Sequence, residues 1–282
     1  MSALRVLTIL VRYGDTQYPR AEAEIDEIFA RQLPGVAREV VVVDNALPAE
    51  HVERTPGRTL LGGDNRVREF TGFDRALAWI GPAIRDYDLV HIATSAFNTL
   101  YTSYLERFTL PVLRAIAAQP ACIGHIDCYN EPVRLDSFVS RHWVRSCFFF
   151  LSPAQVAALG SFVSVLDGRP YFSGDADRPF RPSAPLSENY ARYIIDWLTG
   201  ADIGQGVVWH SRLALSPESL QNFEQKTLCI FNEHMLSIRL RAQGCQLVDV
   251  TWLSAHLATE RKDVPWSLSW REQLARRDRD RL

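Results

Sequence analysis

A carboxylate beside a helical pattern is the feature of this sequence best suited to chemistry. Glu233 is followed by Leu236 and Leu240 at helical spacing, and Gly244 supplies a stop signal. The sequence therefore predicts a helix that Glu233 opens. A carboxylate placed there can act as a general base toward a hydroxyl group, or can simply be favoured by the helix dipole. His234 is an alternative base, although its neighbours indicate the opposite helix face.

Apolar runs and helical patterns alternate through the first hundred residues. Because the strand-like runs are apolar on both faces and separated by helices, they predict a mostly parallel sheet covered by helices on both sides. The predicted strands are 6–11, 40–43, 59–61 and 89–93, and the predicted helices are 21–32 and 70–80. Ligands of such α/β sheets bind at the carboxyl ends of the strands.

Polar residues follow each of these strands and are candidates for binding. A carboxylate at a strand end can accept a hydrogen bond from a base or a ribose, and glycines let backbone amides approach a phosphate. A plain turn or a helix cap explains each short motif as well. The candidates are Tyr13 after the first strand, Asp44 and Asn45 after the second, Gly63, Asp64 and Asn65 after the third, Arg75 in the next helix, and Ser95 and Asn98 after the fourth.

The second half of the chain is less regular. An aromatic strand at 146–151 has His142, Trp143 and Arg145 just before it, where they could contact a sugar, since an aromatic face suits the apolar side of a pyranose. A structural role for the histidine is equally compatible with the pattern. The other expectations are a helix at 101–118 interrupted at Pro111, an irregular polar stretch at 128–143, a proline-rich loop after Leu166, a helix at 187–199, and strands at 121–126, 206–210 and 247–250.

Composition limits the class of protein. With 282 residues, 47% of them hydrophobic, the chain can bury one large core. A formal net charge of −2 gives no electrostatic case for binding nucleic acid. The five cysteines form no CxxC pair, which indicates reduced, buried thiols. The N-terminal apolar run reads as a strand and not as a signal peptide, and no run is long enough to span a bilayer. We expect a cytoplasmic protein.

The segment that contains Glu233 resembles a known signature. Inverting nucleotide-sugar glycosyltransferases with the GT-A fold carry Glu-Asp, two residues, Leu, two residues, Arg-Leu, three residues and Gly, and the second acid is their catalytic base. Aligned in this way, the chain has Asn232 at the family's Glu, Glu233 at its Asp, and Leu236, Arg239, Leu240 and Gly244 at the remaining positions. The chain is similar to bacterial transferases of family 2 and of the rhamnan-synthesis and O-antigen type.

The resemblance implies an architecture, an activity and a set of site residues. It implies a single GT-A (Rossmann-like) domain over residues 1–258, with a nucleotide-binding half at 1–100, an acceptor half at 101–258, and a charged helical tail at 259–282. It implies transfer of a sugar from a nucleotide-sugar donor to a bacterial surface glycan or lipid-linked acceptor, with Glu233 as the base. Nucleotide binding falls to Tyr13, Asp44, Asn45, Gly63, Asp64, Asn65 and Arg75, and sugar or acceptor binding to Ser95, Asn98, His142, Trp143 and Arg145.

The chain departs from this family after the fourth strand. Most members carry Asp-x-Asp there, which holds a divalent cation against the two phosphates. Here the segment 91–98 has no carboxylate pair, so no metal ligand is assigned. Leaving-group charge would then be stabilised by cations and amides, or by a metal held through other ligands. The candidate cations are Arg66, Arg68, Arg75, His142 and Arg145.

Three further alternatives remain open from the sequence. The chain could be a nucleotide- or glycan-binding module of this fold without catalysis, as the missing acids suggest. It could be an α/β hydrolase using Ser95, although the Gly-x-Ser-x-Gly context is absent. The tail, rich in Trp, Leu and Arg, could lie on the inner membrane surface as a peripheral contact, or could be a charged helix docked through its tryptophans.

Overall fold

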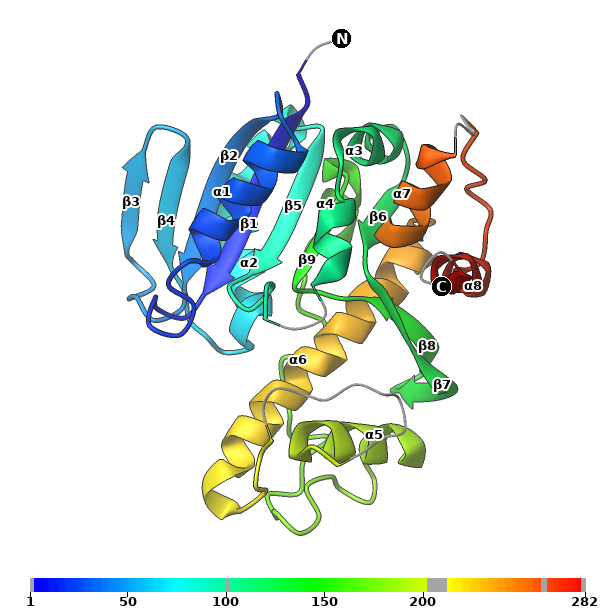
Figure 1. Cartoon of the computed structure of the whole chain (residues 1–282). Helices are drawn as coiled ribbons and strands as arrows, with labels where there is room; N and C mark the ends of the chain where they lie inside the picture. The colour runs from blue at the N-terminus through cyan, green and yellow to red at the C-terminus, as the bar shows by residue number, and fades with distance from the viewer. Residues whose placement is uncertain (1–2, 100–101, 202–211, 260–262, 280–282) are drawn as a thin grey trace.

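The computed structural model describes residues 3–99, 102–201, 212–259 and 263–279 (Figure 1). These residues form a mixed α/β fold around an eight-stranded sheet with the order β10-β6-β9-β5-β1-β2-β4-β3. The mostly parallel sheet confirms the predicted fold class. The parallel strands are β1 (Arg5–Arg12), β2 (Ala37–Asp44), β4 (Arg58–Gly62), β5 (Leu89–Thr94), β6 (Ala121–Gly124) and β10 (Gln246–Asp249), while β3 (Val52–Thr55) and β9 (Phe148–Leu151) run antiparallel to their neighbours.

Helices cover both faces of the sheet because its strands are apolar on both sides. Along β1, Val6 and Leu10 belong to the core on one face, and Ile9 and Val11 to the core on the other. One face is covered by α1 (Ala21–Gln32), η2 (Ser103–Arg107), α3 (Leu110–Ala117) and α7 (Val250–Ala258). The other is covered by α2 (Arg68–Ile80), η1 (Gly81–Asp86), α4 (Pro153–Leu159) and α6 (Pro217–Ala242).

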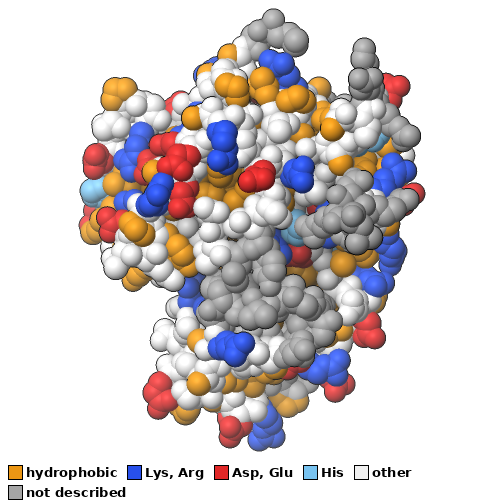
Figure 2. All heavy atoms as spheres, viewed as in Figure 1, with side chains coloured by type: hydrophobic (Ala, Val, Ile, Leu, Met, Phe, Trp, Pro, Cys, Tyr) orange, Lys and Arg blue, Asp and Glu red, His pale blue; other side chains and the backbone are white. Residues whose placement is uncertain are grey.

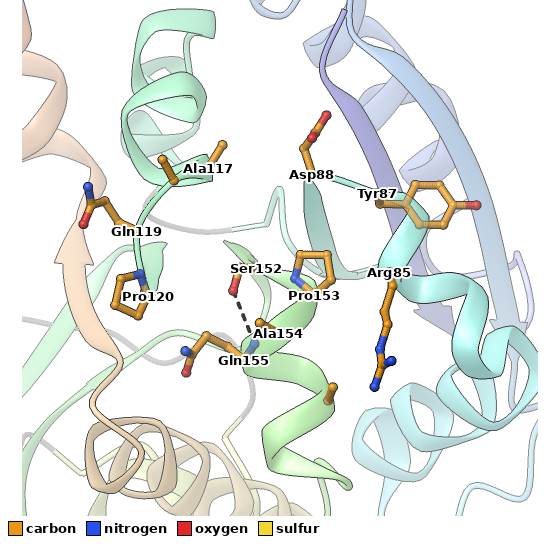
Figure 3. A pocket seen from close by; sticks show the side chains of 12 residues that line it. Arg85, Tyr87, Asp88, Ala117, Gln119, Pro120, Ser152, Pro153, Ala154 and Gln155 are labelled. Atoms are coloured by element: carbon orange, nitrogen blue, oxygen red, sulfur yellow. Dashed lines mark hydrogen bonds between the residues drawn. The ribbon is translucent and has the colours of Figure 1, made fainter.

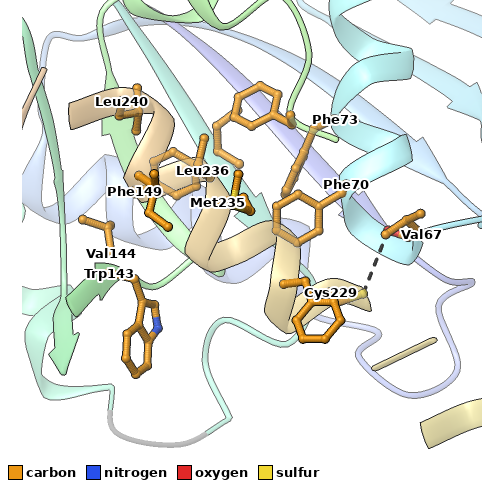
Figure 4. Close-up of a cluster of buried hydrophobic side chains, with 14 of the residues drawn as sticks. Val67, Phe70, Phe73, Trp143, Val144, Phe149, Cys229, Met235, Leu236 and Leu240 are labelled. Carbon is orange, nitrogen blue, oxygen red and sulfur yellow. Dashed lines mark hydrogen bonds between the residues drawn. The ribbon is translucent and has the colours of Figure 1, made fainter. Parts of the chain in front are cut away.

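The helix α6 is the element that connects the sheet to the rest of the molecule. Its upper half packs Leu236 and Leu240 near Phe149 of β9, and Met235 lies toward Phe70 of α2 (Figure 4). Its lower half runs away from the sheet beside α5 (Glu188–Thr199) (Figure 1). One long face of α6 therefore lies between the sheet and the lower part of the molecule.

The predicted start of this helix was wrong. The helix begins at Pro217, with a reciprocal capping box between Ser216 and Ser219, so Glu233 lies in its interior and does not open it. The predicted stop is confirmed, since α6 ends at Ala242 and Gly244 has a φ of 77°. An interior position means that the helix dipole does not account for Glu233.

Two other expectations require correction, and a third is not tested. Residues 128–143 are not irregular, because β7 (Ile126–Leu135) and β8 (Phe138–Val144) form an antiparallel hairpin with a register shift between Cys128 and Val133. The single helix expected at 101–118 is two elements, η2 and α3, and Pro111 lies in the first turn of α3, where no helical hydrogen bond is lost. The strand expected at 206–210 lies outside the described residues.

The proline-rich loop after Leu166 is confirmed as irregular, and its aromatic residues are packed. Tyr171 and Phe172 are both buried, and their rings lie 4.9 and 6.5 Å from that of Phe231 on α6. The loop joins α4 to α5 and carries only isolated bridges such as Phe172 with Phe180 within its described residues. It therefore belongs to the lower part of the core and is not a free linker.

The C-terminal helix α8 (Trp270–Arg279) is docked at the end of the sheet beside β10 and α7 (Figure 1). Trp270 stacks on His142, with ring centroids 4.8 Å apart, and Gln273 bonds the backbone of Leu247 and Asp249 in β10. Of the two interpretations of the tail, the docked helix fits these contacts. Among the described residues, no helix is both long and apolar enough to cross a bilayer.

Charged side chains on the face that carries α1 are mixed in sign. Figure 2 shows basic and acidic groups interspersed over that side of the molecule. Several of them are paired, including Arg58 with Glu22 at 2.5 Å and Arg20 with Glu27 at 2.7 Å. An exposed pair such as Arg20 with Glu27 contributes little to stability.

Candidate functional site

A cavity of about 610 Å³ lies at the carboxyl ends of β1, β2 and β5. The chain leaves β1 toward β2 on one side, and β5 pairs with β1 on the other. This is the topological switch point at which α/β sheets bind ligands. The wall includes the strand ends, the first turn of α2, the connection from β8 to β9, and one face of α6.

A second cavity of about 700 Å³ lies at the opposite, amino ends of β5 and β6 (Figure 3). Its titratable side chains are Arg85, Tyr87 and Asp88. Two of them have structural partners, because Asp88 accepts from the backbone N–H of Arg5 and Tyr87 donates to Glu39. The groups able to do acid–base chemistry are thus in the first cavity.

Glu233 lines the first cavity from the middle of α6. Its Oε1 accepts hydrogen bonds from the backbone N–H of Ser146 at 2.7 Å and from the Ser146 hydroxyl at 2.9 Å. Oε2 accepts none from the described part of the chain. Burial raises the pKa of Glu233 to about 7, the charges of Asp127 and Glu69 act in the same direction, and the Ser146 bonds oppose them. A carboxylate that titrates near neutral pH beside a cavity is suited to general-base catalysis.

Asp127 is a second carboxylate in the wall, and its pKa moves the other way. It pairs with Arg145 through an Oδ2–Nε contact of 2.5 Å and lies 3.4 Å from Nε2 of His125. Burial alone would raise the pKa of Asp127, but the His125 hydrogen bond and the Arg145 charge hold it well below its usual range. Asp127 therefore stays ionised while Glu233 titrates, a separation typical of acid–base sites.

An aromatic wall lies beside Glu233. The rings of Trp143 and His234 are 4.3 Å apart, and Nδ1 of His234 is 2.5 Å from the hydroxyl of Tyr190. His234 lines the same cavity as Glu233, so the expectation that it takes the opposite helix face was wrong. Burial lowers the pKa of His234 to about 3, so the ring is neutral at physiological pH. A base with so low a pKa is weak.

The far end of the cavity is built by a turn before α2. The side-chain amide of Asn45 donates to the backbone carbonyl of Arg68 at 2.9 Å and to Oδ1 of Asn65 at 3.3 Å. Asn65 and Arg68 both have positive φ values, of 53° and 44°. Non-glycine residues in this region store strain and recur at functional sites. Asn45 thus fixes the turn that presents Arg68 to the cavity.

The cavity brings together part of the predicted site. The predicted residues in its wall are Tyr13, Asn45, Asn65, Arg68, Ser95, Trp143, Arg145 and Glu233. The predicted residues outside its wall are Asp44, Gly63, Asp64, Arg66, Arg75, Asn98 and His142.

Most of the residues outside the wall hold the scaffold. Asp44 accepts from Nε of Arg12 at 2.7 Å and from the N–H of Gly14 at 2.8 Å, which organises two strand ends. Arg75 donates to the carbonyl of Gly62, and Asn98 donates to Glu24. Asp64 pairs with Arg66 at 3.0 Å, and His142 is held between Arg241 and Trp270. Gly63 leaves room for Asn45, because a Cβ there would lie 2.0 Å from its Oδ1.

Several wall residues were not found from the sequence. Lys226 carried a usable signal, since it precedes Glu233 by two helical turns and shares its face once the true helix start is known. Asp127 and Ser146 carried none, because they reach the cavity through the hairpin and the turn into β9. Glu69 was hidden in the first turn of α2.

The described side chains around the cavity do not fit a divalent cation. Such an ion needs several oxygen ligands gathered at one point. Within the described residues, no group of three or more His, Cys, Asp or Glu side chains could hold a metal. The end of β5 offers the hydroxyl groups of Thr94 and Ser95, Asp127 is paired with Arg145, and burial raises the pKa of Glu69.

The fold and the cavity define a mostly parallel α/β protein with a cavity at the switch point of its sheet. No family model and no curated protein sequence matches the chain. Among solved structures, it is similar to a mannosyltransferase from Pyrobaculum calidifontis in complex with GDP-Man and Mn²⁺. The likeness covers 95% of this chain and 78% of that chain, at 14% identity and a TM-score of 0.37. It is too weak to assign an activity or a ligand.

Proposed function

We propose that this protein is an inverting glycosyltransferase that uses a nucleotide-sugar donor and takes Glu233 as its base. The observation that carries the proposal is the setting of Glu233: a half-buried carboxylate with a pKa of about 7, on the wall of a cavity at the switch point of an α/β sheet. The resemblance of the segment 232–244 to the transferase signature supports it independently.

The proposed reaction is a single displacement. Glu233 takes the proton of an acceptor hydroxyl through Oε2, while Ser146 holds Oε1. The acceptor oxygen attacks the anomeric carbon, and the bond from that carbon to the phosphate oxygen breaks on the opposite side. Its electron pair leaves with the nucleoside diphosphate, so the configuration inverts. Glu233 then returns the proton to water.

The two ends of the cavity suit the two parts of such a donor. Tyr13, Asn45 and Asn65 line the end next to β1 and β2, where we place the nucleoside. Trp143 and Ser95 line the wall nearer Glu233, where an aromatic face and a hydroxyl suit a pyranose. We propose a bacterial surface glycan or a lipid-linked sugar as the acceptor, in line with the sequence resemblance.

The first test is binding. Purified protein is screened by thermal shift and calorimetry against UDP, GDP, dTDP, CDP and CMP, with and without Mg²⁺ or Mn²⁺. We expect one nucleotide to stabilise the fold in a concentration-dependent way. No response to any of them would contradict the proposal.

The second test is transfer from the matching sugar nucleotide to a panel of glycan acceptors. Glu233→Gln keeps an oxygen for both Ser146 bonds and removes the base, so we expect turnover to fall by about 10²- to 10⁴-fold with donor binding retained. Glu224→Gln, on the same helix and outside the cavity wall, is the matched control and should leave turnover unchanged. Full turnover in the Glu233→Gln variant would remove this mechanism.

A binding module without catalysis is the second candidate, and the donor set that does not fit a metal favours it. Selective nucleotide binding without transfer or donor hydrolysis would support it. The hydrolase alternative lacks support, because no histidine within the described residues is hydrogen-bonded to the Ser95 hydroxyl, as a serine nucleophile requires.

A further inference from the structure

Two cations share one end of the cavity. Lys226 lines it from α6, and Arg68 lines it from the first turn of α2. Burial lowers the pKa of the Lys226 ammonium, and the positive charge of Arg68 lowers it further. An ammonium and a guanidinium that line one end of a partly dehydrated cavity suit an anionic ligand.

The fold holds Arg68 in a strained backbone conformation. Its backbone has a φ of 44°, and its carbonyl is fixed by Asn45. Its Nη2 donates to Oδ1 of Asn222 on α6 at 2.5 Å, which ties the guanidinium to the helix that carries Lys226. Its Nε is buried and has no partner within the described residues. A strained backbone with an unused donor at a cavity points to a ligand.

The acid next to Arg68 in the chain is Glu69. Its Oε2 accepts from the thiol of Cys229 at 3.7 Å. Burial raises the pKa of Glu69, and the positive charge of Arg68 opposes that shift.

Lys226 and the proposed catalytic base Glu233 lie on the same face of α6. Lys226 and Glu233 are two turns apart, which places their Cα atoms about 10 Å apart on the same stripe. Cys229 and Ile230 lie between them in the same wall. A donor that reaches from the cations to the base would present its charged part at one end and its reacting carbon toward the other.

We propose that Lys226 and Arg68 bind the diphosphate of the donor directly. These two side chains would then neutralise the phosphate charge in place of a divalent metal ion. The inference rests on the proposed function. As the bond to the anomeric carbon breaks, negative charge grows on the departing phosphate oxygen, and an ammonium and a guanidinium stabilise it in a low-dielectric site.

The test is calorimetric titration of the full chain with the nucleoside diphosphate selected in the screen, once in EDTA and once in Mn²⁺. We expect equal affinity within about twofold in both buffers. Lys226→Met should weaken diphosphate binding at least about tenfold and leave binding of the bare nucleoside unchanged. Arg68→Met is the second variant, and Arg85→Met in the other cavity is the matched control, which should bind as the unmodified protein does.

Each outcome separates this inference from the proposed function. Tight binding in Mn²⁺ that disappears in EDTA, or unchanged binding in Lys226→Met, overturns the cation pair and leaves the transferase proposal standing. Failure of every nucleotide in both buffers removes both.

Amine labelling gives a readout that needs no variant. Lys226 and Lys262 are the lysines of this chain, so two peptides report all lysine acylation. A saturating nucleoside diphosphate should protect Lys226 by at least about fivefold, because an ion-paired ammonium is a poor nucleophile. Unchanged labelling of Lys226 under saturation would contradict the proposal.

Discussion

At the scale of single residues, the site depends on how one carboxylate is held. Two hydrogen bonds from Ser146 fix Oε1 of Glu233, burial raises its pKa to about 7, and the facing charges of Asp127 and Glu69 add to that effect. The base form therefore becomes the majority only above neutral pH.

The pH dependence of turnover follows from this setting. We expect kcat/KM to rise with pH through an apparent pKa of about 7 and then to level off, because Glu233 must be ionised to accept a proton. Ser146→Ala removes the hydroxyl bond that opposes the shift, so its profile should move to higher pH. A pH–rate profile from 5 to 9 measures both. An acid limb near the ordinary glutamate value would contradict the role of Glu233.

The free energy of unfolding should fall as the pH rises, whereas turnover should rise. The folded state raises the pKa of Glu233 from 4.5 to about 7, so the folded protein holds a proton that the unfolded chain releases. The associated stability is complete below about 4.5 and is lost as pH rises through about 7, by up to about 3 kcal/mol. Glu233→Gln should remove this loss, as urea unfolding at pH 5 and pH 8 would show. Exposed Glu131→Gln is the control and should retain it.

At the scale of elements, the turn between β4 and α2 builds the cationic end of the cavity. Asn45, at the end of β2, fits against Gly63, where any Cβ would lie 2.0 Å from the amide oxygen. Gly63→Ala should displace Asn45, lower the free energy of unfolding by about 1–3 kcal/mol, and weaken nucleotide binding. In an Asn45→Ala background the same change should cost much less, because the clashing atom is gone. Equal costs in both backgrounds would show that Asn45 does not fix the turn.

The sequence predicts helices and strands well where burial requires a clear pattern of apolar residues. The strands β1, β2, β4 and β5 are runs of buried apolar residues, so the parallel half of the sheet follows directly from composition. The edge strand β3 was missed because all four of its residues are exposed. The hairpin of β7 and β8 was missed because an exposed stretch at 130–132 interrupts the buried positions of β7. Its pairing depends on packing against α5 and α6.

The residues of the candidate site also divide into those that the sequence predicts and those that only the fold brings to the cavity. Glu233 and the strand-end residues Asn45 and Ser95 reach the cavity by local rules that a sequence displays. Asp127, Ser146 and Lys226 reach it through tertiary packing of the hairpin and of α6. The start of α6 at Ser216–Pro217 was a readable cap signal, and using it would have placed Lys226 and Glu233 on one face.

At the scale of the whole molecule, the cavity lies where two parts of the chain meet. One wall is formed by the carboxyl ends of β1, β2 and β5, and the other by α6 with the hairpin and the end of α5. A ligand that touches both walls stabilises their arrangement by mass action. The position of the hairpin therefore matters for the site, and α8 contributes to it from the far side.

A buried ion pair ties α8 to the hairpin. Asp249 is fully buried at the end of β10, where it caps α7 through Trp252 and accepts from the N–H of Ile126 at 3.1 Å. Arg277 of α8 donates to Asp249 at 2.9 Å and to the carbonyl of Ile126 at 3.0 Å. Ile126 precedes Asp127, so this pair anchors the chain just before a site carboxylate.

Removing the cation alone should be costly. Arg277→Met leaves the buried Asp249 carboxylate without its ion pair, and we expect the free energy of unfolding to fall by about 3–5 kcal/mol. Adding Asp249→Asn should recover part of this loss, because the stranded charge is removed while the amide oxygen still caps α7. Arg276→Met on the same helix is the control, with an expected change below about 0.5 kcal/mol. Urea unfolding measures all three, and equal stability of Arg277→Met and Arg276→Met would show that α8 does not hold the hairpin.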